Sequence, residues 1–189
     1  MKKVFLKEVV CDRRQGALVS VGWKFPPEGI LKLNCDGAVD VNSIAACRGV
    51  LRDSSGDFVF AFTSMLGTCS VVQAELWAIF HGLRIINERG ISDPIIIESD
   101  SALAVKFLNE GCSRENPCYS LVNLIVNMTG NNLDVKCNHI FREANQVADC
   151  LAKRGIGILD GIQIFSSPPW VMTPLFADSS NNVIFPRGF

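Results

Sequence analysis

Apolar and polar residues alternate in three successive stretches of the chain, and a period of two residues is typical of β-strands. The stretches are Ile30–Asp36, Ala45–Asp53 and Phe58–Met65. Asp36 and Gly37 are expected to end the first strand in a turn. Residues 53–57, with the sequence Asp-Ser-Ser-Gly-Asp, are typical of a hairpin connection between the other two strands. We therefore predict three consecutive antiparallel strands.

The hydrophobic period changes after residue 70, where five apolar residues recur on one helical face: Val72, Leu76, Ile79, Leu83 and Ile86. This period predicts a helix over Val71–Asn87. The remaining predicted elements are a buried strand at Pro94–Asp100, a helix capped by Ser99 or Asp100 and ending near Leu108, a helix at Pro117–Met128, a strand at Leu133–Phe141 and a helix at Ala144–Arg154. The order predicts an α/β fold in which helices flank a five-stranded mixed sheet.

Breaks in this pattern divide the chain into three parts. The run Pro26-Pro27-Glu28-Gly29 predicts an N-terminal extension over residues 1–25 and a domain over 26–156, followed by a C-terminal tail over 157–189. We expect no secretory signal, because the N-terminus is charged, and no membrane span, because no apolar run is long enough. We also expect a monomer. The eight scattered cysteines form no C-x-x-C pair, which indicates an intracellular compartment, with nucleus and cytoplasm both open.

Four acids lie at the ends of predicted strands or inside predicted helices: Asp36, Glu75, Asp100 and Asp149. Each alone can be a turn residue, a cap or an ordinary helix acid. Glu75 and Asp149 are embedded in apolar sequence, however, where an uncompensated charge is costly. If the four met at one place, bound cations would relieve their repulsion, and carboxylate oxygens favour Mg²⁺ or Mn²⁺ over zinc. The net charge of -1 then becomes compatible with a polyanionic partner.

Five segments resemble, in order, the motifs of type 1 ribonuclease H: Leu33–Ala38, Gly49–Asp53, Gln73–Ala78, Ile97–Ser101 and Arg142–Ala152. More narrowly, the chain is similar to the ribonuclease H-like domains of plants, many of which are related to non-LTR retrotransposon polyproteins. The opening Trp23–Gly29 and the closing Pro186-Arg187 also resemble that plant group.

The resemblance implies a ribonuclease H-like fold and hydrolysis of the RNA strand of RNA–DNA hybrids with two Mg²⁺ ions, for which Mn²⁺ can substitute. By this resemblance Asp36 would bridge both metals, Glu75 and Asp100 would complete one site, and Asp149 would bind the other. The products would have 5′-phosphate and 3′-hydroxyl ends. Five residues are assigned to the substrate in the same way: Gly37, Asn42, Gln73, Ser101 and Asn145. For Asn145, a role in orienting the last helix is the stronger interpretation.

The positions of the two histidines argue against a catalytic histidine in this chain. Many members of the family have a histidine on a loop before the last acid, but His139 falls inside a predicted strand and His81 inside a predicted helix. Structural roles are therefore favoured for both. A catalytically weak or inactive domain derived from a retrotransposon, which binds nucleic acid or a partner, is the main alternative. A 3′–5′ exonuclease on a related fold is less favoured, because the motif order and the three-strand start match ribonuclease H better.

Overall fold

The computed structural model of the protein describes residues 19–130, 134–146, 148, 161–168 and 185–187. The described elements are β1 (Val19–Val21), β2 (Leu31–Val39), β3 (Ala45–Arg52), β4 (Phe58–Gly67), α1 (Val71–Glu88), β5 (Ile95–Ser99), α2 (Ala102–Glu110), α3 (Tyr119–Gly130), β6 (Val135–His139), the 3₁₀ turn η1 (Arg142–Ala144), β7 (Ile162–Phe165) and β8 (Phe185–Arg187). None of the described helices is both long and apolar enough to cross a membrane.

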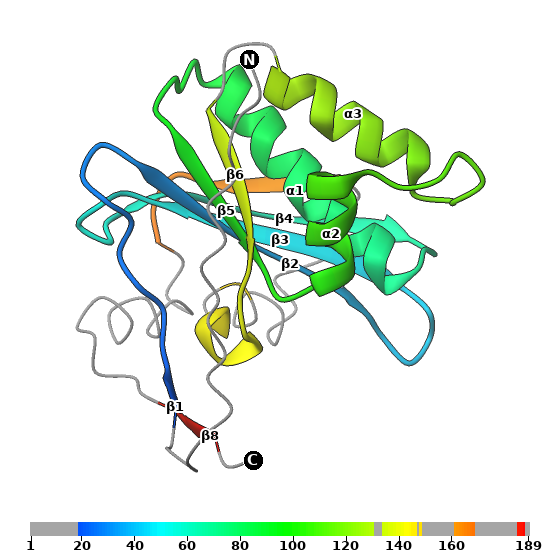
Figure 1. Ribbon diagram of the computed structural model, residues 1–189, viewed down its shortest axis with the longest axis horizontal. Helices are drawn as coiled ribbons and strands as arrows, with labels where there is room; N and C mark the ends of the chain where they lie inside the picture. Colours follow the sequence, from blue (N-terminus) through cyan, green and yellow to red (C-terminus); the bar gives the residue numbers. More distant parts are fainter. Residues whose placement is uncertain (1–18, 131–133, 147, 149–160, 169–184, 188–189) are drawn as a thin grey trace.

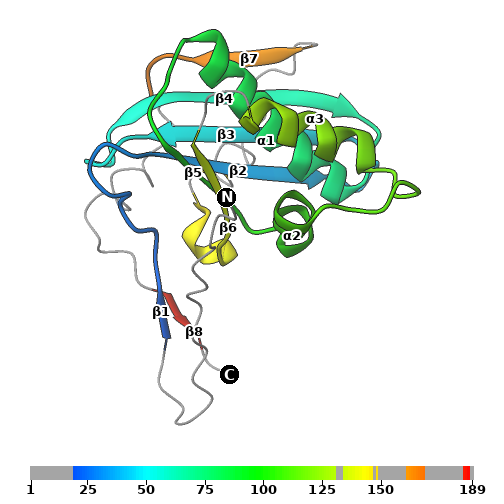
Figure 2. The same cartoon turned by 45° about the horizontal axis from the view of Figure 1, so that its top comes forward.

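A mixed sheet forms the centre of the molecule, with strand order β6-β5-β2-β3-β4-β7 (Figure 1). Strand β3 runs antiparallel to β2 and β4, whereas β5 runs parallel to β2 and β6. Strands β1 and β8 pair separately as an antiparallel ladder that lies away from the main sheet (Figure 2). The predicted α/β class, the mixed sheet and the three initial antiparallel strands are confirmed.

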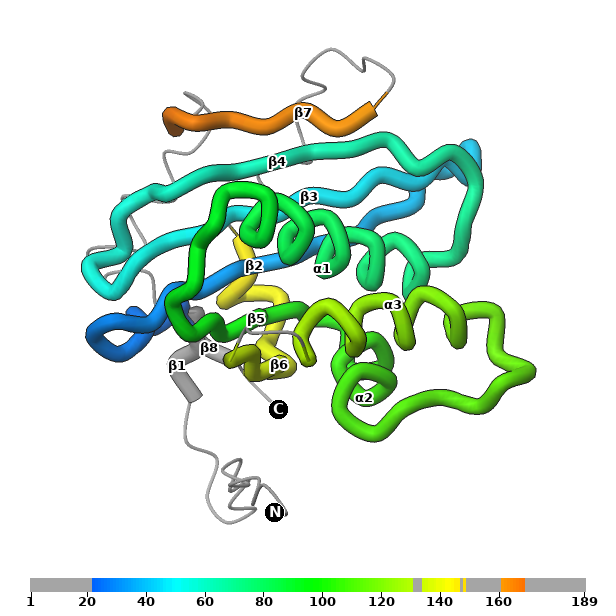
Figure 3. Tube along the Cα trace, turned by 90° about the horizontal axis from the view of Figure 1, so that it is seen from above, coloured from blue at the N-terminus to red at the C-terminus, as the bar shows by residue number. Residues whose placement is uncertain are grey.

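The sheet has six strands where five were predicted, because β7 pairs antiparallel with β4 at the sheet edge (Figure 3). Its four residues, Ile162–Phe165, lie beyond residue 156, where we expected the domain to end. A strand this short has no clear alternation, and its position is fixed by pairing with β4. The predicted last helix, Ala144–Arg154, lies mostly outside the described residues. Of its described residues, Ala144 ends the 3₁₀ turn η1, and Gln146 and Ala148 are α-helical.

The first predicted strand continues past its expected end. Strand β2 includes Asp36 and Gly37 and runs to Val39, and the turn follows it, where the Asp40 side chain accepts hydrogen bonds from the backbone N–H groups of Asn42 and Ile44. The prediction of a turn at Gly37 was therefore wrong. A Cβ atom at Gly37 would lie 2.3 Å from Ala74 C and 2.3 Å from Glu75 N, so this glycine allows close contact between β2 and α1.

The apolar core lies between the sheet and its helices. Alternate residues of the central strands, including Leu33, Leu51 and Ile97, face this side and pack with Leu76 and Ile79 of α1. Helix α1 begins with a capping box, in which Ser70 accepts a hydrogen bond from Gln73 N while the Gln73 side chain accepts one from Ser70 N. The cap fixes the start of the helix, and the apolar face then fixes its position on the sheet.

The opposite face of β2, β3 and β5 is polar yet buried. Asn34 donates to Glu98 Oε2 at 3.0 Å and accepts from Arg52 at 2.8 Å. Glu98 also forms an ion pair of 2.8 Å with Lys32, and both side chains are less than a tenth exposed. Trp23 covers this group, with the Arg52 guanidinium 3.4 Å from its ring centroid. We call Lys32, Asn34, Arg52 and Glu98 the polar network.

We expect Gly37→Ala to lower the free energy of unfolding by about 1–3 kcal/mol or more, because the added methyl group meets the backbone of α1. Urea denaturation in EDTA measures the change. Gly130→Ala is the matched control, because nothing lies within 4 Å of a Cβ atom at that helical position. Equal stability of the two variants would contradict the close contact.

We expect Glu98→Gln to destabilise the protein by about 3–5 kcal/mol, because it leaves the buried Lys32 ammonium without its counter-charge. In the exposed pair Lys106–Glu110, which is 4.0 Å long, Glu110→Gln should cost less than about 1 kcal/mol. Parallel urea titrations of the two variants compare them. A loss for Glu98→Gln no larger than that for Glu110→Gln would disprove a structural role of the network.

Candidate metal centre

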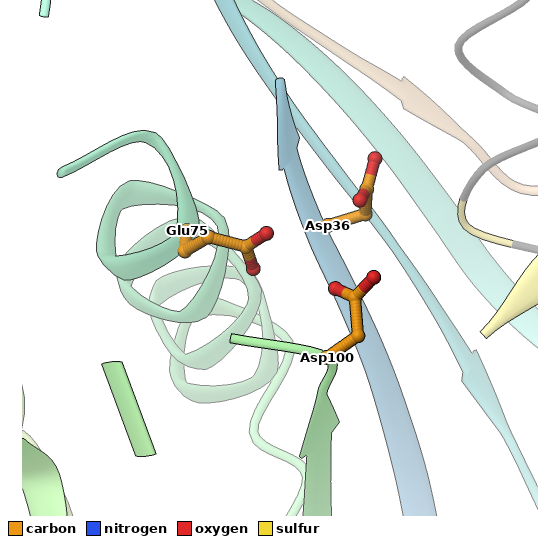
Figure 4. A group of neighbouring side chains, drawn as sticks. All are labelled: Asp36, Glu75 and Asp100. Carbon is orange, nitrogen blue, oxygen red and sulfur yellow. The ribbon is translucent and has the colours of Figure 1, made fainter. Parts of the chain in front are cut away.

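Three of the four predicted acids meet at one place. Oxygen atoms of Asp36, Glu75 and Asp100 all lie within 4.8 Å of one another. Asp36 comes from β2, Glu75 from the second turn of α1, and Asp100 from the position after β5, and their carboxylates converge (Figure 4). Because β2 and β5 are parallel and adjacent, Asp36 and Asp100 follow the registered pair Cys35 and Ser99 by one residue each.

Glu75 is the most buried member of the cluster, with 4% of its surface exposed. Its carboxylate accepts a hydrogen bond of 3.0 Å from Ser99 Oγ and one from the backbone of Gly37. Burial, followed by the negative charges of Asp36 and Asp100, raises the pKa of Glu75 from its ordinary 4.5 to about 8, although both hydrogen bonds lower it. The cluster thus carries an excess of negative charge, which protonation or a bound cation can neutralise.

Asp36 has a positive partner that the sequence analysis did not identify. Arg48 lies directly opposite Asp36 in the β2–β3 register, and its Nε atom is 3.0 Å from Asp36 Oδ2. The two side chains are 5% and 13% exposed. The Nε–H group is not aligned for a hydrogen bond, so the contact is an ion pair without a directed bond.

Asp100 is held through its backbone. His139, the last residue of β6, lies with Nε2 3.2 Å from the Asp100 carbonyl oxygen, and this contact is a hydrogen bond when Nε2 carries the proton. Ser101 caps α2 by accepting from Ala104 N, so the predicted cap at Ser99 or Asp100 was wrong. Two residues separate β5 from α2, a bend at Asp100 and the extended cap residue Ser101, whose N–H donates to Ser99 Oγ while that hydroxyl donates to Glu75.

The remaining predicted site residues lie in several environments. Asp149 is outside the described residues. Asn145 is buried, donates to Cys35 O at 2.7 Å and accepts from Asn34, which fits the orienting role better than substrate contact. Asn42 lies in the exposed turn after β2, while Gln73 belongs to the capping box of α1. Gly37 is buried against α1. The assignment of substrate contacts to these residues stays a prediction.

His81 lies apart from this chemistry. Its ring stacks on Trp77 at 5.5 Å between centroids and contacts Phe80 and Phe62 edge-on. Burial, followed by the positive charge of Arg84, lowers the pKa of His81 from 6.5 to about 4. The ring is consequently neutral at pH 7, as expected for a histidine packed in an aromatic cluster.

The three converging carboxylates fit a divalent cation. Their oxygen atoms are hard donors, and Mg²⁺ is commonly bound through one or two carboxylates together with water and substrate phosphate. A cation would also supply the positive charge that the buried Glu75 lacks. Asp36 and Asp100 are partly exposed, so an ion and a substrate can approach from their side.

A mixed sheet with a reversed second central strand, and acids on β2, on α1 and after β5, define a ribonuclease H-like domain. The chain belongs to the reverse transcriptase-like family, whose profile matches residues 34–155. An Arabidopsis thaliana protein whose name suggests a ribonuclease H is 34% identical over 168 residues, which is 88% of this chain. The chain spans 27% of the length of that relative.

Solved structures agree with the fold. A ribonuclease H1 from the archaeon Halobacterium salinarum has a TM-score of 0.58 and 26% identity, over 65% of this chain and 94% of the archaeal one. LC11-RNase H1, solved in complex with an RNA/DNA hybrid, has a TM-score of 0.58 and 20% identity, over 63% and 91% of the two chains. The predicted relationship to type 1 ribonuclease H is confirmed.

We expect Glu75 to make the stability of the metal-free protein depend on pH. Because the folded-state pKa lies above the unfolded value, its contribution is fully present below about pH 4.5 and is lost as the pH rises through about 8. Between these two pH values the free energy of unfolding should fall by up to about 1.4 kcal/mol per pH unit. Glu75→Gln should remove this slope in urea titrations at pH 5–9 with EDTA.

Glu88→Gln is the control for this experiment, because Glu88 lies on the same helix but pairs with Arg84 at an exposed position. This variant should keep the pH dependence of the wild type. If Glu75→Gln and Glu88→Gln have the same slope, the carboxyl group of Glu75 is not the group that titrates.

Proposed function

We propose that this chain hydrolyses the RNA strand of RNA–DNA hybrids by a two-metal-ion mechanism, in which Asp36, Glu75 and Asp100 bind Mg²⁺ or Mn²⁺. The observation that carries the proposal is the convergence of these carboxylates within 4.8 Å on a ribonuclease H-like sheet. The hybrid bound by LC11-RNase H1 supports the choice of substrate class. The resemblance of the sequence motifs supports the endonucleolytic reaction.

The residues around the cluster hold its ligands in place. Ser99 and Gly37 orient the Glu75 carboxylate, while His139 contacts the backbone of Asp100. When bound, two divalent ions would activate the attacking water and stabilise the leaving oxygen in an in-line displacement. Ligands held in this way lower the cost of assembling such a site, since the Glu75 carboxylate and the Asp100 backbone need little rearrangement on binding.

Asp149 is retained in the proposal as the fourth ligand. Asn145, four residues before it in the sequence, is bound to β2 through Cys35 O and Asn34. Asn145 acts as a positioning residue in this scheme, because its side chain is buried among protein groups. Asn42 is exposed in the turn after β2, where its backbone N–H donates to Asp40. Its side chain is therefore the candidate that is best placed to contact a substrate.

A second candidate function is a domain that binds nucleic acid or a partner with little or no catalysis, derived from a retrotransposon. One observation favours it: the Arg48 guanidinium already pairs with Asp36, the acid expected to contact both metals. Between Leu103 and Leu121 only Lys106 and Arg114 are basic, so affinity for a hybrid should be modest.

We expect the purified protein to cleave the RNA strand of a labelled hybrid in Mg²⁺ or Mn²⁺ and to leave single-stranded RNA and duplex RNA intact. Asp36→Asn should abolish cleavage, with a loss of at least about a hundredfold, because it removes a charged metal ligand. Denaturing gels of the labelled strand measure the products, and treatment with phosphatase identifies their 5′-phosphate ends.

Asp93→Asn is the control, because Asp93 is an exposed aspartate in the turn before β5. This variant should cleave like the wild type. An intact hybrid in both metals, combined with equal hybrid binding by wild type and Asp36→Asn, would favour the binding domain over the enzyme.

A further inference from the structure

Arg48 contacts the carboxylate of Asp36, one of the three acids of the candidate metal centre. The two residues are partners in the central β2–β3 ladder, and Arg48 Nε is 3.0 Å from Asp36 Oδ2. The Arg48 residue is 4% exposed, which leaves it little room to contact a substrate. An arginine guanidinium is a permanent cation in proteins. One of the two Asp36 oxygens is therefore in contact with a permanent cation.

The pair is held in place by the sheet. Strand β3 is hydrogen-bonded to β2 on one side and to β4 on the other, and Arg48 has register partners in both neighbours, Asp36 and Thr63. The ladder fixes the backbone of Arg48, and its side chain, which is 5% exposed, has little space in which to turn away from Asp36. A divalent ion on Asp36 must consequently share the carboxylate with the guanidinium or displace it, and like charges at such short range repel strongly.

We propose that Arg48 is an internal counter-cation that competes with divalent metal ions for Asp36 and so weakens metal binding at this centre. The inference rests on the proposed metal site. It adds that this site needs a higher metal concentration than its carboxylates alone would require. In the metal-free protein the same arginine offsets part of the repulsion among Asp36, Glu75 and Asp100.

The two effects of Arg48 have opposite signs, and this distinguishes the proposal from a purely structural role. Removal of the guanidinium should destabilise the metal-free protein, because three clustered carboxylates lose a positive neighbour. The same removal should tighten metal binding, because a competitor is lost. A residue needed only for folding would weaken stability and metal binding together.

The test is Mn²⁺ binding to the full chain, measured by the loss of the free-ion signal in electron paramagnetic resonance. We expect Arg48→Gln to lower the Kd at least about tenfold relative to the wild type, which corresponds to about 1.4 kcal/mol. Arg48→Lys keeps the charge and should stay within about threefold of the wild type, since repulsion depends on the charge. Arg84→Gln, which removes an arginine on α1 paired with Glu88, should leave Kd unchanged.

Thermal denaturation gives a second readout. Without metal, Arg48→Gln should melt below the wild type, and the rise in Tm on addition of Mn²⁺ should be larger for the variant. If Arg48→Gln does not fold in EDTA, Mn²⁺ should restore its circular dichroism spectrum. Failure of Mn²⁺ to restore the fold would overturn the proposal.

The outcomes separate this inference from the proposed function. A wild-type protein that binds Mn²⁺ as tightly as Arg48→Gln does would overturn the competition and leave the metal site intact. A wild-type protein and an Arg48→Gln variant that both fail to bind Mn²⁺ would overturn the metal site itself, and the inference with it.

Discussion

Helix α1 crosses strand β2 so closely at Gly37 that no side chain fits between them. The geometry of the centre depends on this contact. It places the second turn of the helix directly beside the strand, so the Glu75 carboxylate reaches Asp36 and Asp100 and accepts a hydrogen bond from the backbone of Gly37. A larger residue would move the whole helix, because the contact involves its backbone and leaves no flexible group to yield.

The two faces of the sheet differ in polarity. The face under α1 and α3 is apolar and supplies most of the hydrophobic burial. On the opposite face, Lys32, Asn34, Arg52 and Glu98 form a buried network beneath Trp23, and Asp36 continues this face along β2. Asn145 joins the network through Asn34. Motif residues without a role in metal chemistry therefore connect the metal centre to the packing of the domain.

Much of this arrangement could be predicted from the sequence. The switch from a period of two to a helical period correctly predicted β2 to β4 and α1. Glu75 lies in the expected helix, and Asp100 lies at the end of the expected strand. The continuation of β2 through Asp36 and Gly37 could not be predicted, because Asp-Gly is a good turn sequence and the need for a small residue arises only from contact with α1. Arg48 was missed for a similar reason. Its partner is twelve residues away in sequence and is defined only by the register of β2 and β3.

The parallel pairing of β2 with β5 also determines the dimensions of the centre. Asp36 and Asp100 each follow one member of the registered pair Cys35 and Ser99, so their separation comes from the backbone spacing of neighbouring strands, which is about 4.8 Å. The pairing of β2 with β5 thus sets the spacing of these two ligands, and surface substitutions elsewhere do not change that spacing. A slip of one residue between the strands, in contrast, would turn one aspartate to the other side of the sheet and dismantle the centre in a single step.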